Sequence, residues 1–270
     1  MIAPTRWLMS NSEKDAEGDS PKFDGDRLTT VEHWDSAYQA PIRLRLPSPL
    51  LASTGDSRRE FRKWVKAGDK VLEIGFAPGK QLAWIAQALG ASVSGIDFSA
   101  PGVRLSQQLF EHLGLTGDLR CEDVFATSFP LGSFDVVYSQ GVIEHFHDPR
   151  AIVRRHFELL RPGGVAVITI PNYAGIYGRL QARLDPENLS IHNTSIMTRD
   201  TFAALVPSDI AESVTVRYTG RLTSALVSFE RRLPASLTSA LFWGVNAIAH
   251  LQPWDVKLVA PRLVCTGIRR

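Results

Sequence analysis

The 270-residue chain lacks a hydrophobic run of membrane-spanning length. Its most apolar stretch near the C-terminal end, Leu237 to Leu251, has 15 residues and includes Ser, Asn and His. A spanning helix needs about 20 consecutive apolar residues. The sequence therefore argues against a transmembrane helix here, while a helix lying on a membrane surface stays open.

Cysteine is scarce and charge is nearly balanced. Cys121 and Cys265 have no metal-like spacing and no secretory signal ahead of them, which predicts reduced thiols in a cytoplasmic protein. The formal net charge is +2, and Lys and Arg are scattered along the chain. Nucleic-acid binding usually requires clustered basic residues, so we expect no nucleic-acid partner.

Glycines are missing where a dinucleotide-binding motif would need them. The stretch Val71 to Lys80, VLEIGFAPGK, is typical of a buried strand that enters a turn of small residues and then a helix. The G-x-G-x-x-G pattern starting at Gly75 would require glycines at 77 and 80, where the chain has Ala77 and Lys80. This register disfavours an NAD-type oxidoreductase.

Small residues instead follow an acid at every second position: Glu73, Gly75, Ala77 and Gly79. Here the chain resembles the class I S-adenosylmethionine (SAM)-dependent methyltransferases, whose first motif is E/D-x-G-x-G-x-G, with Ala77 in place of the middle glycine. The resemblance implies that SAM is the cofactor and S-adenosylhomocysteine the product. It also implies that this loop holds the methionine part of the donor.

The expected strands follow in the family's order. Asp97 ends the second strand about 20 residues after Gly75, where a carboxylate can accept two hydrogen bonds from a ribose diol. The remaining donor-site residues are implied by the resemblance: Phe98 beside Asp97, Asp123 and Val124 near the adenine, and Gln140 and Gly141 beside the sulfonium.

The resemblance, together with 44% hydrophobic residues and alternating strands and helices, predicts an α/β fold. We expect a Rossmann-like, seven-stranded, mostly parallel sheet with helices on both faces and an antiparallel last strand. An N-terminal helical cap and a helical insert before the last strand complete it. The predicted units are a mobile tail over 1–30, the cap over 31–64 and the core over 65–270, with an acceptor-side loop at 172–198 and the insert at 221–252.

The insert, read as two helices broken at Pro234, has three candidate roles: covering the core, forming a homodimer face, or contacting a membrane surface through 222–251. In the cap, Trp34 and Tyr38 either help close the site or pack on the core. In the acceptor-side loop, Tyr173 and Tyr177 are candidates for the acceptor pocket or for packing.

Two histidines are the candidate general bases. His145 follows the fourth strand directly, and His192 lies in the long loop; each has a structural alternative, as a turn residue or a solvated loop side chain. A metal set of His145, His147 and His192 is conceivable, but no acidic cluster accompanies it in the sequence, so we expect no metal. The other histidines, in helical segments, are expected at the surface or at an interface: His33, His112, His156 and His250.

The sequence therefore predicts a SAM-dependent methyltransferase that acts on a small molecule, at a hydroxyl oxygen of a sugar or phenol or at a carboxylate. The region after the fifth strand is similar to that of methyltransferases of ubiquinone biosynthesis and of bacterial glycan or secondary-metabolite pathways. The alternatives are N-methylation of a small molecule, an NAD-type oxidoreductase, and a SAM-binding protein without transferase activity.

Overall fold

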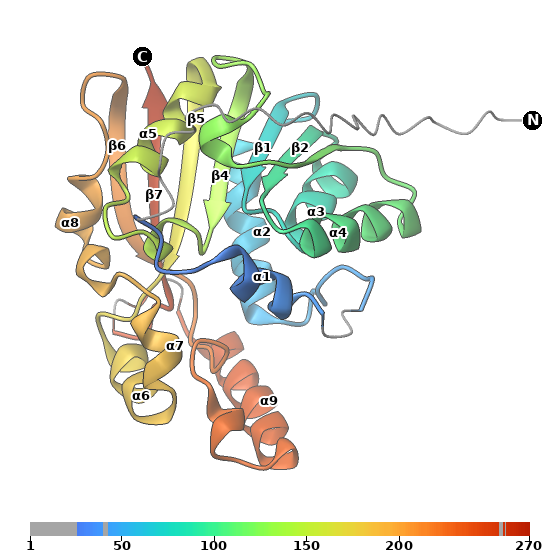
Figure 1. Ribbon diagram of the computed structural model, residues 1–270. Coiled ribbons are helices and arrows are strands. Elements are labelled where there is room, and N and C mark those ends of the chain that lie inside the picture. Colours follow the sequence, from blue (N-terminus) through green and yellow to red (C-terminus); the bar gives the residue numbers. More distant parts are fainter. Residues whose placement is uncertain (1–25, 40–42, 254–255, 257) are drawn as a thin grey trace, which may run out of the picture.

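A computed structural model describes residues 26–39, 43–253, 256 and 258–270 of the chain (Figure 1). The predicted tail over 1–30 therefore lies almost entirely outside the described residues. Seven strands form one sheet in the order β3-β2-β1-β4-β5-β7-β6. Their bounds are β1 Lys70–Ile74, β2 Ser92–Asp97, β3 Asp118–Cys121, β4 Phe134–Gln140, β5 Leu160–Pro171, β6 Ala211–Thr219 and β7 Arg262–Arg269.

Strand direction confirms the Rossmann-like fold predicted from the sequence. The pairs from β3 through β5 are parallel, and β7 is antiparallel to both β5 and β6. The strand order reverses between β1 and β4, and ligands of open α/β sheets bind at such a switch point, beyond the carboxyl ends of the strands.

The sheet is buried on both faces, which is why its central strands are almost continuously apolar. In β4, Val136 and Tyr138 pack into one hydrophobic cluster while Val137 packs into the other. Phe61 and Phe110 belong to the first cluster. The helices on that face are α2 Ala52–Trp64, α3 Lys80–Leu89 and α4 Ala100–His112.

The opposite face is covered by α5 Arg150–Leu159 and α8 Arg199–Ala203, through Phe157 and Phe202 respectively. The start of α8 is set by two threonines, Thr198 and Thr201. Thr198 accepts a hydrogen bond from the backbone N–H of Thr201, whose hydroxyl in turn accepts one from the Thr198 N–H. This reciprocal pair is a capping box, which fixes the start of the helix.

Several helices lie beyond the carboxyl ends of the parallel strands, at the bottom of Figure 1. The short helix α1 Val31–Ala37 is capped by the Thr30 side chain and packs against α4. The acceptor-side loop contains α6 Ile176–Leu184, α7 Pro186–Ser190 and the 3₁₀ turn η4 Thr194–Ile196. Further 3₁₀ turns follow β3 and β4: η2 Val124–Ala126 and η3 Ile143–His145.

The first of the two helices predicted in the insert is absent from the structure of 222–233, which holds only the 3₁₀ turn η5 Phe229–Arg231. Side chains from elsewhere replace the helical hydrogen bonds. The N–H of Leu222 donates to Gln252, and that of Ser228 donates to Gln181. The second helix is present as α9 Ala235–Leu251.

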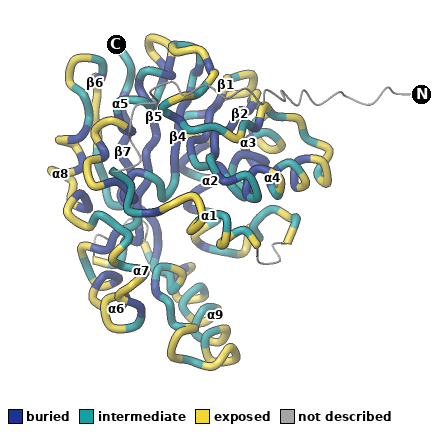
Figure 2. The backbone as a smooth tube through the Cα atoms, viewed as in Figure 1, coloured by how far each residue is buried: buried dark blue, intermediate teal, exposed yellow. Residues whose placement is uncertain are grey.

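Helix α9 exposes much of its apolar surface (Figure 2). Trp243 and Ile248 are 54% and 57% exposed, and Leu251 is 87% exposed. Among the described residues, no helix combines the length and hydropathy needed to cross a bilayer. The membrane-surface and homodimer roles of the insert stay predictions.

Candidate functional site

The turn after β1 is thin because its glycines adopt backbone conformations that other residues avoid. Gly75 has φ of +71°, and its N–H donates to the Ile96 carbonyl at 2.8 Å. A Cβ at Gly75 would lie 2.5 Å from Cγ2 of Val142. Gly79, with φ of +74°, is the N-cap residue that precedes α3. The backbone between them is therefore open to a ligand.

Asp97 ends β2 with its carboxylate held by the neighbouring backbone. Oδ2 accepts a hydrogen bond from the Ala77 N–H at 3.0 Å, and Oδ1 accepts one from the Ser99 N–H at 2.9 Å. Burial raises the pKa of Asp97, and these two N–H donors oppose the rise. A carboxylate can accept about four hydrogen bonds, so each oxygen keeps capacity for a further donor.

These elements enclose a pocket at the carboxyl ends of β1, β2 and β4. It lies at the switch point of the sheet, where the fold is expected to bind its ligand. Predicted residues that the structure places in its wall are Gly75, Ala77, Asp97, Phe98, Val124, Gln140, Gly141 and His145.

Three of the predicted donor-site residues lie outside that wall. Glu73 is buried beneath it and accepts a hydrogen bond from the Tyr138 hydroxyl at 2.7 Å; burial raises the pKa of Glu73 to about 8. Gly79 lies against α4, where a Cβ would be 3.0 Å from Cβ of Ser106. The Asp123 carboxylate accepts from the Phe125 N–H at 2.9 Å and pairs with Arg27 at 2.6 Å.

The N-terminal segment lines the pocket with Trp34 and Tyr38, for which closing the site was one of two expectations, and with Arg27 and Thr29, which the sequence did not reveal. Arg27 and Thr29 line the pocket, and the Arg27 guanidinium lies 5.0 Å from the centre of the Phe98 ring. Trp34 and Tyr38 line it too, and the Tyr38 hydroxyl donates to the Ala77 carbonyl at 3.0 Å. Arg27 contacts Asp123 across 96 residues of chain, a separation that leaves no periodic signal.

A second pocket adjoins the first. The two share Gln140, Gly141 and His145, all from β4 or the turn after it. Its other walls come from the turn after β4, from β5, from the acceptor-side loop, from the insert and from β7. These residues are Glu144, Thr169, Ile170, Pro171, Tyr173, His192, Leu226 and Arg262.

Both candidate histidines face this second pocket, and their rings lie 4.7 Å apart between centroids. Nδ1 of His145 is 2.8 Å from the Ile191 carbonyl, and Nδ1 of His192 is 2.8 Å from the Asn188 carbonyl. A carbonyl only accepts, so both Nδ1 atoms carry the proton and both Nε2 atoms carry a lone pair. Burial lowers the pKa of His145 to about 4 and also lowers that of His192.

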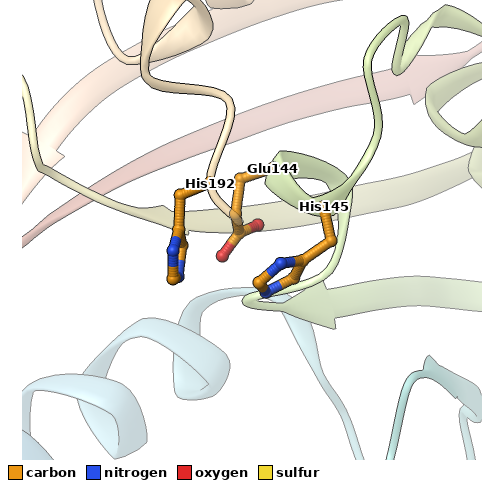
Figure 3. Close-up of side chains that lie close together, drawn as sticks. All are labelled: Glu144, His145 and His192. Carbon is orange, nitrogen blue, oxygen red and sulfur yellow. The ribbon is translucent and has the colours of Figure 1, made fainter. Parts of the chain in front are cut away.

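Glu144 lies between these two imidazoles (Figure 3). Its side chain is buried, and Oε2 has no hydrogen-bond partner among the described residues. Burial raises the pKa of Glu144 to about 8. Glu144 directly precedes His145 in the sequence, where it does not form an acidic cluster, and folding brings both residues to His192. His147, the third histidine considered from the sequence, is exposed instead.

Two other expectations from the sequence need comment. His33, His112 and His250 are exposed as expected, but His156 is fully buried, so its predicted position at the surface or at an interface was wrong. Its ring bridges α5 and β4 through the Ile152 carbonyl and the Ser139 hydroxyl. A hydrogen-bonded imidazole costs little to bury, and hydrophobic periodicity does not reveal such a partner.

Of the two loop tyrosines, only Tyr173 lines the second pocket, where its ring lies edge-on to that of His192. The Tyr177 hydroxyl donates to the Val259 carbonyl at 2.7 Å, outside either pocket wall.

The comparison with protein families bears on this arrangement. Residues 72–168, which span β1 to β5, match the family described as "Methyltransferase domain". The chain carries a class I SAM-dependent methyltransferase domain. The family predicted from Glu73, Gly75, Ala77 and Gly79 is thereby confirmed, and with it SAM as the cofactor of the domain.

Similar curated proteins include methyltransferases of two kinds. Ubiquinone biosynthesis O-methyltransferase of Psychrobacter cryohalolentis is 36% identical over 109 residues, 39% of this chain and 42% of that protein. Phosphoethanolamine N-methyltransferase 1 of Arabidopsis thaliana is 31% identical over 121 residues, 43% of this chain and 25% of that protein. The chain thus matches less than half the length of each.

Solved structures support the fold. Phosphoethanolamine N-methyltransferase 2 of Haemonchus contortus, in complex with phosphomonomethylethanolamine and S-adenosylhomocysteine, superposes with a TM-score of 0.56. The two sequences are 16% identical, and the match covers 79% of this chain and 51% of that one. At this identity the likeness concerns the methyltransferase fold alone.

Proposed function

We propose that the protein transfers the methyl group of SAM to a hydroxyl oxygen of a small-molecule acceptor. SAM would occupy the first pocket, with its ribose at Asp97 and its sulfonium beside Gln140 and Gly141. The acceptor would occupy the second pocket. The observation that carries this proposal is that the two pockets share a wall at Gln140, Gly141 and His145.

Methyl transfer from a sulfonium is a displacement in which acceptor, methyl carbon and sulfur lie in line. The enzyme must align the two reactants and exclude water from between them. Adjoining pockets with a common wall provide that alignment. The C–O bond forms as the C–S bond breaks, and the positive charge on sulfur is lost as the donor becomes a neutral thioether.

An oxygen acceptor must also lose its proton, which an amine acceptor can lose after transfer. The second pocket contains two imidazoles, His145 and His192, each with an Nε2 lone pair available to a hydroxyl. This feature favours oxygen as the acceptor atom. The relatives named above include both O- and N-methyltransferases, so the choice of oxygen rests on these side chains.

The acceptor pocket has the mixed lining expected for a small organic molecule. Pro171, Tyr173 and Leu226 provide apolar surface, while Thr169 and Arg262 provide polar groups. A ring or short chain bearing a hydroxyl fits this chemistry. Of the classes expected from the sequence, a sugar or a phenol fits the proposal, because a carboxylate carries no proton for the imidazoles to remove.

Two measurements test the proposal. Isothermal titration calorimetry with S-adenosylhomocysteine tests the donor pocket directly, and we expect one molecule bound per chain. Incubation with trideuteromethyl-SAM and a metabolite extract, followed by mass spectrometry, should reveal a labelled small molecule. Fragmentation of that product shows whether the label is on oxygen or nitrogen.

The variants separate the two pockets. Asp97→Asn should weaken donor binding and transfer together, whereas His192→Gln should retain donor binding and lose transfer. Donor binding without any labelled product would favour a SAM-binding protein without transferase activity. Binding of NADH without binding of S-adenosylhomocysteine would contradict the assignment of the first pocket to SAM, and with it the proposal.

A further inference from the structure

We infer that Glu144, His145 and His192 bind a divalent transition-metal ion in the wall of the second pocket. The inference that the ion binds depends only on these side chains. The inference that the ion takes part in catalysis rests on the proposed methyl transfer. One ring nitrogen of each histidine and one carboxylate oxygen of Glu144 all lie within 4.8 Å of one another. Figure 3 shows the carboxylate between the two rings.

The spacing of these atoms suits a single ion. Zn–N and Zn–O bonds are about 2.0–2.2 Å long, so ligand atoms on one ion lie up to about 4 Å apart. Small side-chain rotations close the remaining gap. All three residues line the second pocket, which provides a path for the ion to enter.

The buried carboxylate of Glu144 is the second, independent observation. Glu144 is 1% exposed, and its Oε2 has no hydrogen-bond partner within the described part of the chain. A buried polar atom without a partner costs about 1–3 kcal/mol, so native structures rarely retain one without a reason. A cation bound at Oε2 would satisfy it.

Both imidazoles are already oriented as metal ligands usually are. A ligating histidine donates its other ring N–H to a carbonyl or carboxylate, which fixes its tautomer and turns the free nitrogen to the metal. His145 and His192 each donate Nδ1–H to a backbone carbonyl, those of Ile191 and Asn188. The two donations leave Nε2 of each ring unprotonated.

The surrounding chain holds the two ligand segments together although they are far apart in sequence. The Asn193 N–H donates to the Glu144 carbonyl at 2.7 Å. The Asn193 side-chain amide donates to the carbonyls of Phe146 and His147, at 3.1 and 2.9 Å. The turn after β4 and the acceptor-side loop are thus joined directly beside the proposed ligands.

The donor set selects the class of ion. Two imidazoles and one carboxylate suit Zn²⁺, Mn²⁺, Fe²⁺ or Co²⁺, whereas Mg²⁺ and Ca²⁺ prefer oxygen ligands. Three protein ligands leave a coordination position for a water or an acceptor hydroxyl. With an ion bound, both Nε2 lone pairs would serve as ligands and no longer as bases, and the ion would instead lower the pKa of an acceptor hydroxyl bound at that position, so that water could take its proton.

The test uses Co²⁺ and Zn²⁺ on the full chain without an affinity tag, after removal of metals by a chelator. Co²⁺ reports its ligands through visible absorption bands, and Zn²⁺ binding is measured by calorimetry. We expect one ion per chain with cobalt bands typical of nitrogen and oxygen ligands. Glu144→Gln and His192→Ala should each weaken binding at least about tenfold.

His147→Gln is the matched control, because this exposed histidine lies on the same turn and should leave metal binding unchanged. Binding of S-adenosylhomocysteine, measured on every variant, confirms that the fold and donor pocket are intact. The site is refuted if His147→Gln weakens metal binding as much as Glu144→Gln does, or if His192→Ala binds the metal as tightly as the wild-type protein. Donor binding without metal binding overturns this inference alone, whereas loss of donor binding in the wild-type protein overturns the proposed function.

Discussion

Replacing Asp97 with asparagine tests the donor pocket through one carboxylate. The two oxygens of Asp97 each accept one backbone N–H, from Ala77 and Ser99, and each retains capacity for one ribose hydroxyl. Asparagine keeps one oxygen but replaces the other with an NH₂ group. That group cannot accept, so one backbone hydrogen bond and one ribose hydrogen bond are lost together.

The size of the effect follows from the charge of the acceptor. A hydrogen bond to a charged group contributes about 1.5–3 kcal/mol, and about 1.4 kcal/mol corresponds to a tenfold change in affinity. Loss of the ribose bond should weaken S-adenosylhomocysteine binding by roughly 10- to 150-fold. Loss of the backbone bond should lower the free energy of unfolding by about 1–3 kcal/mol, because an N–H of the donor loop becomes unpaired.

Calorimetry at a temperature well below unfolding measures the affinity, and urea denaturation measures stability separately. Asp118→Asn is the control, since Asp118 is an exposed acid at the start of β3 that pairs with Arg120. It should change donor affinity by less than about twofold, as surface ion pairs contribute little. Unchanged affinity in Asp97→Asn would refute the placement of the ribose at this carboxylate.

The remaining predictions concern the donor loop and its surroundings. Gly75→Ala should lower the free energy of unfolding, measured by urea denaturation, more than Gly68→Ala does. Both variants place alanine at a positive φ, which costs about 1–2 kcal/mol. The added methyl group meets a neighbouring side chain, Val142, at Gly75 and meets no atom at Gly68. Equal losses would contradict the close contact. Burial raises the pKa of Glu73 to about 8 in the folded protein, while its pKa in the unfolded chain is near 4.5. The stabilisation from protonated Glu73 is therefore complete below pH 4.5 and is lost as the pH rises to 8. The free energy of unfolding falls over this range by at most about 1.4 kcal/mol per pH unit. The Glu73→Gln variant should remove that slope from unfolding midpoints measured between pH 5.5 and 8, and an identical slope would disprove it. Tyr38→Phe removes the hydrogen bond to the donor loop and should speed S-adenosylhomocysteine dissociation about 2- to 10-fold in stopped-flow measurements; an unchanged rate would mean that the contact does not close the pocket.

The central sheet and the donor loop were predictable from the sequence because local patterns determine them. The apolar run after Lys70 marked β1, and Asp97 was expected to end the second strand, as it does in β2. The glycine spacing after β1 identified the donor loop, since few residues tolerate positive φ there.

Contacts between distant segments were not predictable in this way. Arg27 reaches Asp123, and Glu144 reaches His192, through the tertiary fold. No periodicity connects such pairs. The prediction of the first insert helix was wrong for a related reason. The composition of this segment favours a helix, but the side chains of Gln181 and Gln252 accept hydrogen bonds from its backbone and hold it in a different conformation.

The order of the chain separates the walls of the two pockets. Every residue lining the first pocket lies between Arg27 and Ile152, while the second pocket takes its remaining walls from Glu144 and from Thr169 onward. The end of β4 and the turn after it serve both pockets. A chimera that exchanges everything downstream of β5 for the matching part of a relative should therefore acquire that relative's choice of acceptor while keeping its own donor chemistry, which makes this boundary a natural point of recombination.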